Sequence, residues 1–143
     1  PHTLFDGGRE KAPAALSRMV AQAKLSRRHE IKIWGDGEQT RSFLFIDDCL
    51  DGTLALAASD VAEPLNVGSE RLISINGLVD LLEGIAVIKL RRTYNLAAPK
   101  GVRGRSSDNT LVSRRLGWQP RVPLEVGLEA TYRWIHDEIA RRA

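Results

Sequence analysis

The chain has 143 residues, a size typical of one domain, and 43% hydrophobic with 27% charged residues is the composition of a globular protein. Its apolar runs are much shorter than the roughly 20 residues of a membrane span. The net charge is +3, but the arginine pairs are scattered and only 6% of residues are aromatic, so a nucleic-acid surface is not indicated. The single cysteine, Cys49, excludes an internal disulfide and favours a reducing, cytoplasmic setting.

The first elements predicted are a loop, a helix and a strand. Residues 1–12 are rich in glycine and charge, which indicates a loop. Pro13 suits the first turn of a helix, because its missing N–H has no partner there, and the apolar spacing continues to about Lys24. Residues 30–34 alternate between polar and apolar side chains, as expected of a half-buried strand.

A turn, a short extended run and a second helix follow. The glycines in residues 35–37 predict a hairpin turn, and residues 41–45 form the next extended run. Asp47 is expected to cap a helix. The apolar positions of that helix include Leu50, Leu54 and Ala57.

The middle of the chain alternates again between strand and helix patterns. Residues 65–67 predict a strand that ends at Gly68. Ser74 is expected to cap a helix. That helix carries Leu78, Leu81, Leu82 and Ile85, and residues 90–96 predict a further strand.

The last part of the chain predicts a loop and two helices. Residues 97–107 form the loop, Asp108 is expected to cap a short helix, and Gly117 to end it. Pro123 opens a final helix with one apolar stripe. The stripe consists of Leu124, Leu128, Tyr132, Ile135 and Ile139. Short elements of alternating type predict a mixed α/β fold.

The common catalytic and cofactor motifs do not occur in this sequence. No glycine-rich dinucleotide loop follows a strand, and no phosphate-binding Walker loop is present. Metal-ligand spacings are also missing, and the three histidines lie far apart in sequence. We therefore assign no cofactor-binding and no metal-binding residue to this chain. The three tryptophans are expected to pack in the interior, and Cys49 to be a small buried residue.

Three polar stretches carry more than fold information. Arg103 and Arg105 stand two apart between glycines, so that in an extended segment both guanidinium groups point to the same side and can grip phosphate oxygens. Alternatively, these two arginines bind no ligand and form ion pairs with Asp108 or Glu10. Residues 39–41 lie beside a tight turn and either bind a ligand or stabilise the turn. A Glu-Lys pair at residues 10–11 lies at the mouth of the first helix.

These stretches belong to a pattern that resembles the extended short-chain dehydrogenase/reductases that act on nucleotide sugars. The general resemblance rests on residues 35–43, 46–48, 66–68 and 116–120. The whole chain is similar to the C-terminal half of those enzymes. The resemblance implies an α/β substrate-binding lobe covering residues 1–143, in a chain that lacks the N-terminal Rossmann half.

Residues 8–15 and 101–109 are similar to the members that epimerise GDP-mannose at C3 and C5 with a bound NAD. In those members a 4-keto intermediate makes the protons at C3 and C5 acidic, so that an acid and a base can invert both centres. The resemblance implies that Lys11 is the acid opposite a cysteine base, and that Arg105 contacts the diphosphate. The positions corresponding to their substrate contacts are Glu10, Ala12, Gln39, Thr40, Arg41 and Arg105.

The resemblance also sets expectations for the chain as it stands. NAD would bind mainly to the N-terminal half, which also supplies the cysteine base, so the isolated chain is expected to be inactive. The partner is a nucleotide sugar, not nucleic acid or membrane, and a homodimer is compatible with the intact enzyme. The opening Pro1-His2-Thr3 carries no signal peptide and favours a start within a longer protein. The alternatives are a nucleotide-sugar 4-epimerase or 4,6-dehydratase, and a non-catalytic truncated copy.

Overall fold

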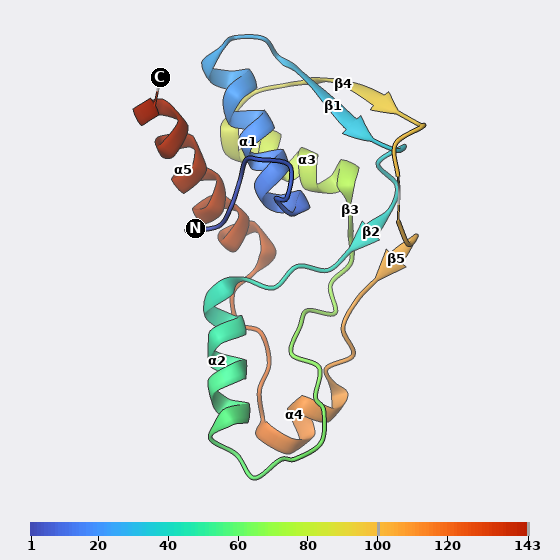
Figure 1. Cartoon of the computed structure of the whole chain (residues 1–143), viewed down its shortest axis with the longest axis vertical. Helices are drawn as coiled ribbons and strands as arrows, with labels where there is room; N and C mark the ends of the chain where they lie inside the picture. The colour runs from blue at the N-terminus through green and yellow to red at the C-terminus, as the bar shows by residue number, and fades with distance from the viewer. Residues whose placement is uncertain (100, 143) are drawn as a thin grey trace.

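The computed structural model describes residues 1–99 and 101–142, which form an α/β fold (Figure 1). In chain order the elements are α1 (Ala12–Leu25), β1 (Glu30–Trp34), β2 (Thr40–Arg41), α2 (Ile46–Ala57), β3 (Ile73–Ser74), α3 (Ile75–Ala86), β4 (Arg91–Asn95), β5 (Gly104–Arg105), α4 (Thr110–Leu116) and α5 (Leu124–Arg142). The predicted α/β class is thereby confirmed. Of the helices described, none combines the length and apolar character needed to cross a bilayer.

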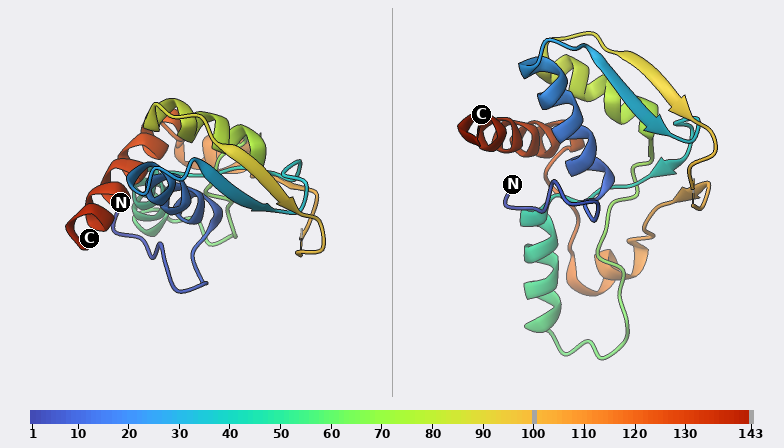
Figure 2. Two further views of the ribbon diagram at one scale, coloured as in Figure 1. Left: turned by 90° about the horizontal axis from the view of Figure 1, so that it is seen from above. Right: turned by 45° about the horizontal axis from the view of Figure 1, so that its top comes forward.

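The main core lies between α1, α3, α5 and a two-stranded parallel sheet of β1 and β4. The two strands pair from Glu30↔Arg91 to Trp34↔Asn95, and they lie along one side of the helices (Figure 2). Apolar side chains from α1, β1, α3 and α5, together with Leu90 just before β4, form one buried cluster. It includes Val20, Ile31, Ile33, Leu78, Leu82, Leu90, Leu128 and Tyr132. The predicted strand at residues 30–34 is confirmed, and its alternation reflects burial of every second residue.

The predicted hairpin at residues 35–37 is wrong. The chain does turn there, with Gly35 and Gly37 at positive φ, but β1 and β2 belong to different sheets. β2 pairs antiparallel with β3 and parallel with β5. A local glycine pattern specifies a turn, whereas strand partners are chosen by contacts distant in sequence, and here these come from β3, β4 and β5.

Helix signals that depend on neighbouring residues were predicted well. The Ser74 hydroxyl accepts a hydrogen bond from the Gly77 N–H at 2.9 Å, which confirms its capping role. Gly117 ends α4 at φ 63°, as expected. The cap of α4 differs by one residue, because Asn109 occupies the N-cap position while Asp108 accepts from the Thr110 N–H at 2.9 Å.

The lower part of the molecule in Figure 1 consists of α2, α4 and the segment between α2 and β3. Asp47 does not cap α2: it lies in the first turn, after the N-cap Phe45. Residues 65–67 form no strand in the structure, although they pack closely, since a Cβ on Gly52 would lie 2.6 Å from Val67 and 2.8 Å from Trp118. A strand needs a partner, and none of the described segments pairs with residues 65–67.

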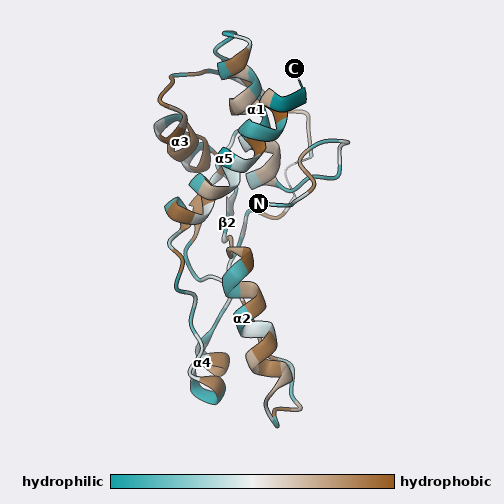
Figure 3. Ribbon diagram, turned by 90° about the vertical axis from the view of Figure 1, so that its left-hand side faces the viewer, coloured by the Kyte–Doolittle hydropathy of each residue, from teal (hydrophilic) through white to brown (hydrophobic). Residues whose placement is uncertain are grey.

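One face of α2 is apolar and exposed. Ile46, Leu50 and Leu54 follow one another at intervals of four residues and are 47%, 52% and 66% exposed. Figure 3 shows hydrophobic residues along this helix. The apolar positions predicted from the sequence are therefore real, but nothing in the described structure covers them. We call Ile46, Leu50 and Leu54 the α2 stripe.

The tryptophans divide into three situations. Trp118 is 7% exposed and packs in the interior, as predicted. Trp134 stacks edge-on against Phe5, with ring centroids 5.5 Å apart. The prediction is wrong for Trp34, which is 64% exposed at the end of β1, because the alternation of that strand places it on the outer face. Cys49 is only partly buried.

The pair Arg71–Glu125 predicts a pH-dependent contribution to stability. Arg71 donates two hydrogen bonds to the Glu125 carboxylate, and this lowers the pKa of Glu125 from 4.5 to about 2. A lowered pKa stabilises the fold at pH values above 4.5, and this contribution is lost as the pH falls toward 2. Since both side chains are about half exposed, Glu125→Gln is expected to cost about 0.2–1 kcal/mol at pH 7. Urea unfolding of both proteins at pH 7 and pH 2 measures this, and a difference that persists at pH 2 would contradict the assignment.

Candidate functional site

Lys11 lies at the N-cap of α1, beside a cavity of about 300 Å³. Pro13 in the first turn begins the helix there, and the Lys11 carbonyl accepts from the Ala15 N–H at 2.9 Å. The Lys11 side chain is exposed and shares the cavity wall with residues 42–45 and the first turns of α5. A primary amine is thus presented to a mainly apolar hollow. Ala12, the first residue of α1, packs against the core.

Glu10, next to Lys11, points in a different direction and is held by Arg18. The two side chains form an ion pair at 2.9 Å, and the Glu10 side chain is 7% exposed. The pKa of Glu10 is lowered, first by its own backbone N–H and then, against the opposing effect of burial, by Arg18. Arg18 Nε also donates to the Phe5 carbonyl at 2.7 Å, which closes the loop before Lys11. Sequence reasoning missed Arg18, since its role depends on the folded path of this loop.

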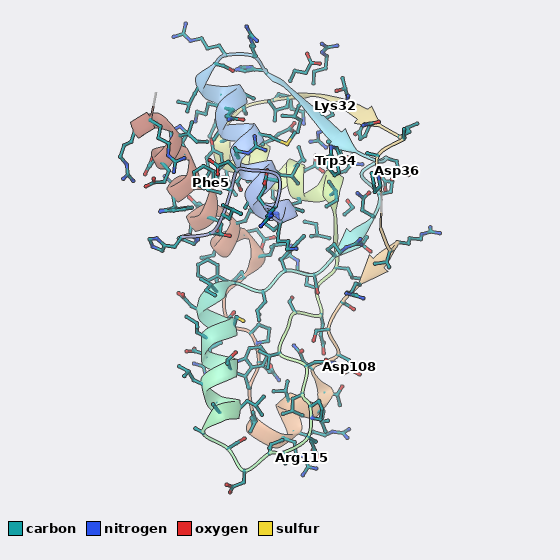
Figure 4. All side chains as sticks on the ribbon, in the orientation of Figure 1. Phe5, Lys32, Trp34, Asp36, Asp108 and Arg115 are labelled. Atoms are coloured by element: carbon teal, nitrogen blue, oxygen red, sulfur yellow. The ribbon has the colours of Figure 1, made fainter. Side chains whose placement is uncertain are left out.

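One oxygen of Glu10 is left without a partner. Glu10 Oε2 is buried and makes no hydrogen bond within the described part of the chain. Glu10 lines a hollow of about 590 Å³ together with Gly8, Arg18 and the exposed Trp34. Figure 4 labels Trp34, at the end of β1. A buried carboxylate oxygen without a donor is costly, so it is suited to a ligand that brings an N–H or O–H group.

Gln39, Thr40 and Arg41 form the end of the turn and the strand β2. Gln39 Nε2 donates to the Trp34 carbonyl at 3.3 Å, which braces the turn, while its Oε1 is buried with no partner among the described residues. Arg41 Nη1 donates to the carbonyl of the preceding Thr40 at 2.6 Å. The predicted turn-stabilising role therefore applies to Gln39, and it leaves one acceptor of Gln39 available.

Arg41 and Arg105 are direct partners in neighbouring strands. β2 and β5 pair in parallel with Thr40↔Gly104 and Arg41↔Arg105 in register. The Thr40 N–H donates to the Arg103 carbonyl at 2.9 Å and the Ser42 N–H to the Arg105 carbonyl at 3.1 Å. Side chains at paired positions share one face of a sheet, so Arg41 and Arg105 leave the sheet on the same face.

Glycine makes this close approach possible. A Cβ on Gly104 would lie 2.8 Å from Thr40 Oγ1, so a side chain there would push β5 away from β2. Gly101, before it, has φ +67°, a conformation that favours glycine. The glycines flanking Arg103 and Arg105 therefore allow the arginine loop to turn and then to join the β2 strand.

The alternative that these arginines form internal ion pairs is not found. Within residues 1–99 and 101–142, neither Arg103 nor Arg105 forms an ion pair, because Glu10 pairs with Arg18 and Asp108 accepts from Thr110. In the same ranges, no group of three potential metal ligands gathers in one place. The structure brings most of the predicted residues into two places: the β2–β5 arginines, and the Lys11 cavity, whose wall at Ser42 begins one residue after Arg41. Glu10 is not brought to either place, because it lines a separate hollow.

The comparisons with known proteins show which proteins this chain is similar to. Residues 4–68 match the model of the NAD dependent epimerase/dehydratase family. The chain is homologous to GDP-mannose 3,5-epimerase: it is 45% identical to the Arabidopsis thaliana protein over 141 residues, covering 99% of this chain and 36% of that relative. The chain thus spans about a third of the length of the curated relatives it matches.

Solved structures show the same fold. The UDP-glucose 4-epimerase of Thermotoga maritima, determined with UDP-glucose, superposes with a TM-score of 0.82 at 29% identity, over 94% of this chain and 42% of that one. The UDP-glucuronic acid 4-epimerase of Bacillus cereus, in complex with UDP-glucuronic acid and NAD, gives a TM-score of 0.77 at 30% identity, over 93% and 43%. The chain therefore has the α/β fold of part of an extended short-chain epimerase.

Proposed function

We propose that this chain is the substrate-binding, C-terminal part of an NAD-dependent enzyme that epimerises GDP-mannose at C3 and C5. The observation that carries the proposal is the Arg41–Arg105 pair, two arginines in register without an acidic partner among the described residues. Like charges at paired strand positions destabilise a sheet. A diphosphate neutralises both, since each guanidinium fork fits phosphate oxygens with two hydrogen bonds. The identity to GDP-mannose 3,5-epimerase supports this choice of substrate.

The remaining residues have roles consistent with such a ligand. The diphosphate on Arg41 and Arg105 would leave the sugar within reach of the cavity that Lys11 lines, where the Lys11 ammonium can hold the proton delivered to carbon. Gln39 Oε1, next to the arginine pair in sequence, offers an unused acceptor to a hydroxyl or N–H group of the nucleotide sugar, whereas Glu10 Oε2 is unused in a separate hollow and could receive only a part of the ligand that extends there. Thr40, between Gln39 and Arg41, holds the arginine loop through its backbone N–H.

Among the described residues, we assign none to NAD binding. Gly7 and Gly8 have positive φ and precede α1, but no described strand leads into them, and the turn at Gly35 and Gly37 leads to a strand and not to a helix. A pyrophosphate site needs a strand, a glycine turn and a helix in that order. The oxidation step is therefore not assigned to any residue here, and Cys49, on α2, does not line the cavity of Lys11.

The α2 stripe supports a division into two domains. Three exposed apolar side chains in one line are unusual for a surface that stays in water. We propose that residues 1–143 form the nucleotide-sugar-binding domain, and that the α2 stripe packs against the NAD-binding part which the longer relatives provide. On this proposal the isolated chain binds substrate but has no epimerase activity.

Calorimetric titration of the chain with GDP-mannose and with UDP-glucose tests the proposal. We expect binding selective for GDP-mannose, reduced at least about tenfold in Arg105→Ala, since hydrogen bonds to charged groups contribute about 1.5–3 kcal/mol. Without ligand, Arg105→Ala is expected to melt at an equal or higher temperature, because it removes a like-charge contact with Arg41. Arg28→Ala, which removes an exposed arginine after α1, is the matched control and is expected to bind normally.

Two results would contradict the proposal. Equal affinity for both ligands would remove the choice of GDP-mannose and favour the second candidate, a nucleotide-sugar 4-epimerase, which the structural similarity to UDP-glucose 4-epimerase supports. Absence of binding together with a cooperative thermal transition would show that this chain does not form the substrate site by itself.

A further inference from the structure

The segment that carries Arg103 and Arg105 is held by backbone hydrogen bonds on both sides. On one side, the carbonyls of Arg103 and Arg105 accept hydrogen bonds from the Thr40 and Ser42 N–H groups, respectively. On the other, the Ser107 N–H donates to the Ser69 carbonyl at 3.1 Å. Beyond Ser107, the hydrogen bonds to residues 68–70 are made by Asn109.

Asn109 is 5% exposed, and its side chain uses both its donor and its acceptor. Its Oδ1 accepts from the Ser107 hydroxyl at 2.7 Å, and its Nδ2 donates to the Gly68 carbonyl at 2.8 Å. Its backbone N–H donates to Glu70 Oε1 at 3.0 Å. Asn109 therefore joins the end of the arginine loop to residues 68–70, which lie far away in sequence.

The position of Asn109 makes this use of its side chain informative. An asparagine at the N-cap of a helix usually accepts from the first turn, yet the Asn109 side chain makes no such bond. Asp108 accepts from the Thr110 N–H instead. Asp108 therefore binds the first N–H of α4, and the Asn109 side chain binds Gly68 and Ser107 instead.

The segments around Gly68 and Ser107 are also closely packed. A Cβ on Gly68 would lie 2.5 Å from the Ser107 Cβ, so the two segments touch at the closest distance that a glycine allows. The amide side chain of Asn109 can both donate to the Gly68 carbonyl and accept from the Ser107 hydroxyl, whereas a carboxylate has no donor and an aliphatic side chain has neither.

We propose that Asn109 is a positioning residue for Arg105, which it keeps in register with Arg41. The proposal rests on the proposed function in one respect only, namely that the paired arginines receive a diphosphate. Asn109 itself touches no ligand, and acts through the path Asn109–Ser107–Arg105.

The first measurement needs no ligand. Backbone amide exchange of Asn109→Ala, followed by NMR, is expected to be faster than in the unchanged chain at Ser42 and Ser107, and unchanged in α3. Asp108→Ala is the matched control: it weakens the same helix at its cap but leaves the hydrogen bonds of Asn109 intact, so exchange at Ser42 and Ser107 is expected to stay as it was. Unchanged exchange at Ser42 in Asn109→Ala would overturn the proposal.

The second measurement is a double-mutant cycle on binding of GDP by calorimetry. Asn109→Ala is expected to weaken GDP binding about fivefold or more, and to have no further effect when Arg105 is already alanine. An equal loss in both backgrounds would mean that Asn109 supports the fold generally, and would overturn the proposal. If the unchanged chain does not bind GDP at all, the proposed function fails, and the exchange rate at Ser42 still decides whether Asn109 positions the loop.

Discussion

Truncation of Leu82 to alanine is expected to lower the free energy of unfolding by about 2–5 kcal/mol, as for other fully buried leucines. Leu82 is 0% exposed in α3, within the cluster shared by α1, β1, α3 and α5. The loss combines the transfer of the side chain with the cavity that remains between elements that cannot close around it. Urea unfolding followed by circular dichroism measures the change as a shift in midpoint at constant slope.

Leu54→Ala is the matched control for this prediction. Leu54 is the same residue type in a helix of the same length, but it belongs to the α2 stripe and is 66% exposed. It is expected to cost less than about 0.5 kcal/mol. A loss comparable to that of Leu82→Ala would show that the α2 stripe is covered in the isolated chain, and would contradict the exposed face described above.

Replacement of Asp48 by alanine is expected to cost about 3 kcal/mol, because it leaves two backbone donors without their charged acceptor. Asp48 is 3% exposed in the first turn of α2, and its Oδ2 accepts from the N–H groups of Arg121 and Val122 at 3.0 and 2.9 Å. This contact fastens the segment before α5, whose Val122 and Leu124 form part of the Lys11 cavity. Chemical denaturation at pH 7 measures the loss.

Two variants make the Asp48 prediction specific. Asp48→Asn keeps one acceptor oxygen and is expected to lose clearly less stability than Asp48→Ala. Asp47→Ala removes the neighbouring exposed carboxylate, whose contribution through the helix dipole is below about 1 kcal/mol. Equal losses for Asp47→Ala and Asp48→Ala would show that the charge at the start of α2 matters, and not the two hydrogen bonds.

The accuracy of the sequence predictions follows the range of the interactions involved. The strand at residues 30–34, the cap at Ser74 and the end of α4 at Gly117 were confirmed, because each depends on a few adjacent residues. The strand at residues 65–67 and the hairpin at residues 35–37 were wrong, because both require knowledge of a partner strand.

The candidate site shows the same limit. The resemblance to a family singled out Lys11, Arg41 and Arg105, and their roles stay predictions until binding is measured. Arg18 was not singled out, and Asp48 and Asn109 lie in the segments 46–48 and 101–109 without a role predicted for them. The sequence does not show which carbonyls and amides these side chains bind, since those groups belong to segments that only the fold brings near.

The sequence by itself determined the α/β class, most helices and their ends, and the similarity to nucleotide-sugar epimerases, because hydrophobic period, caps and motifs depend on adjacent residues. The tertiary structure alone decided that β1 pairs with β4, that Arg41 stands beside Arg105, and that Leu54 and Trp34 lie outside while Leu82 lies inside. Apolar spacing shows which residues can be buried. Which of them are buried depends on whether another segment covers them, and that is set by packing between residues far apart in the chain.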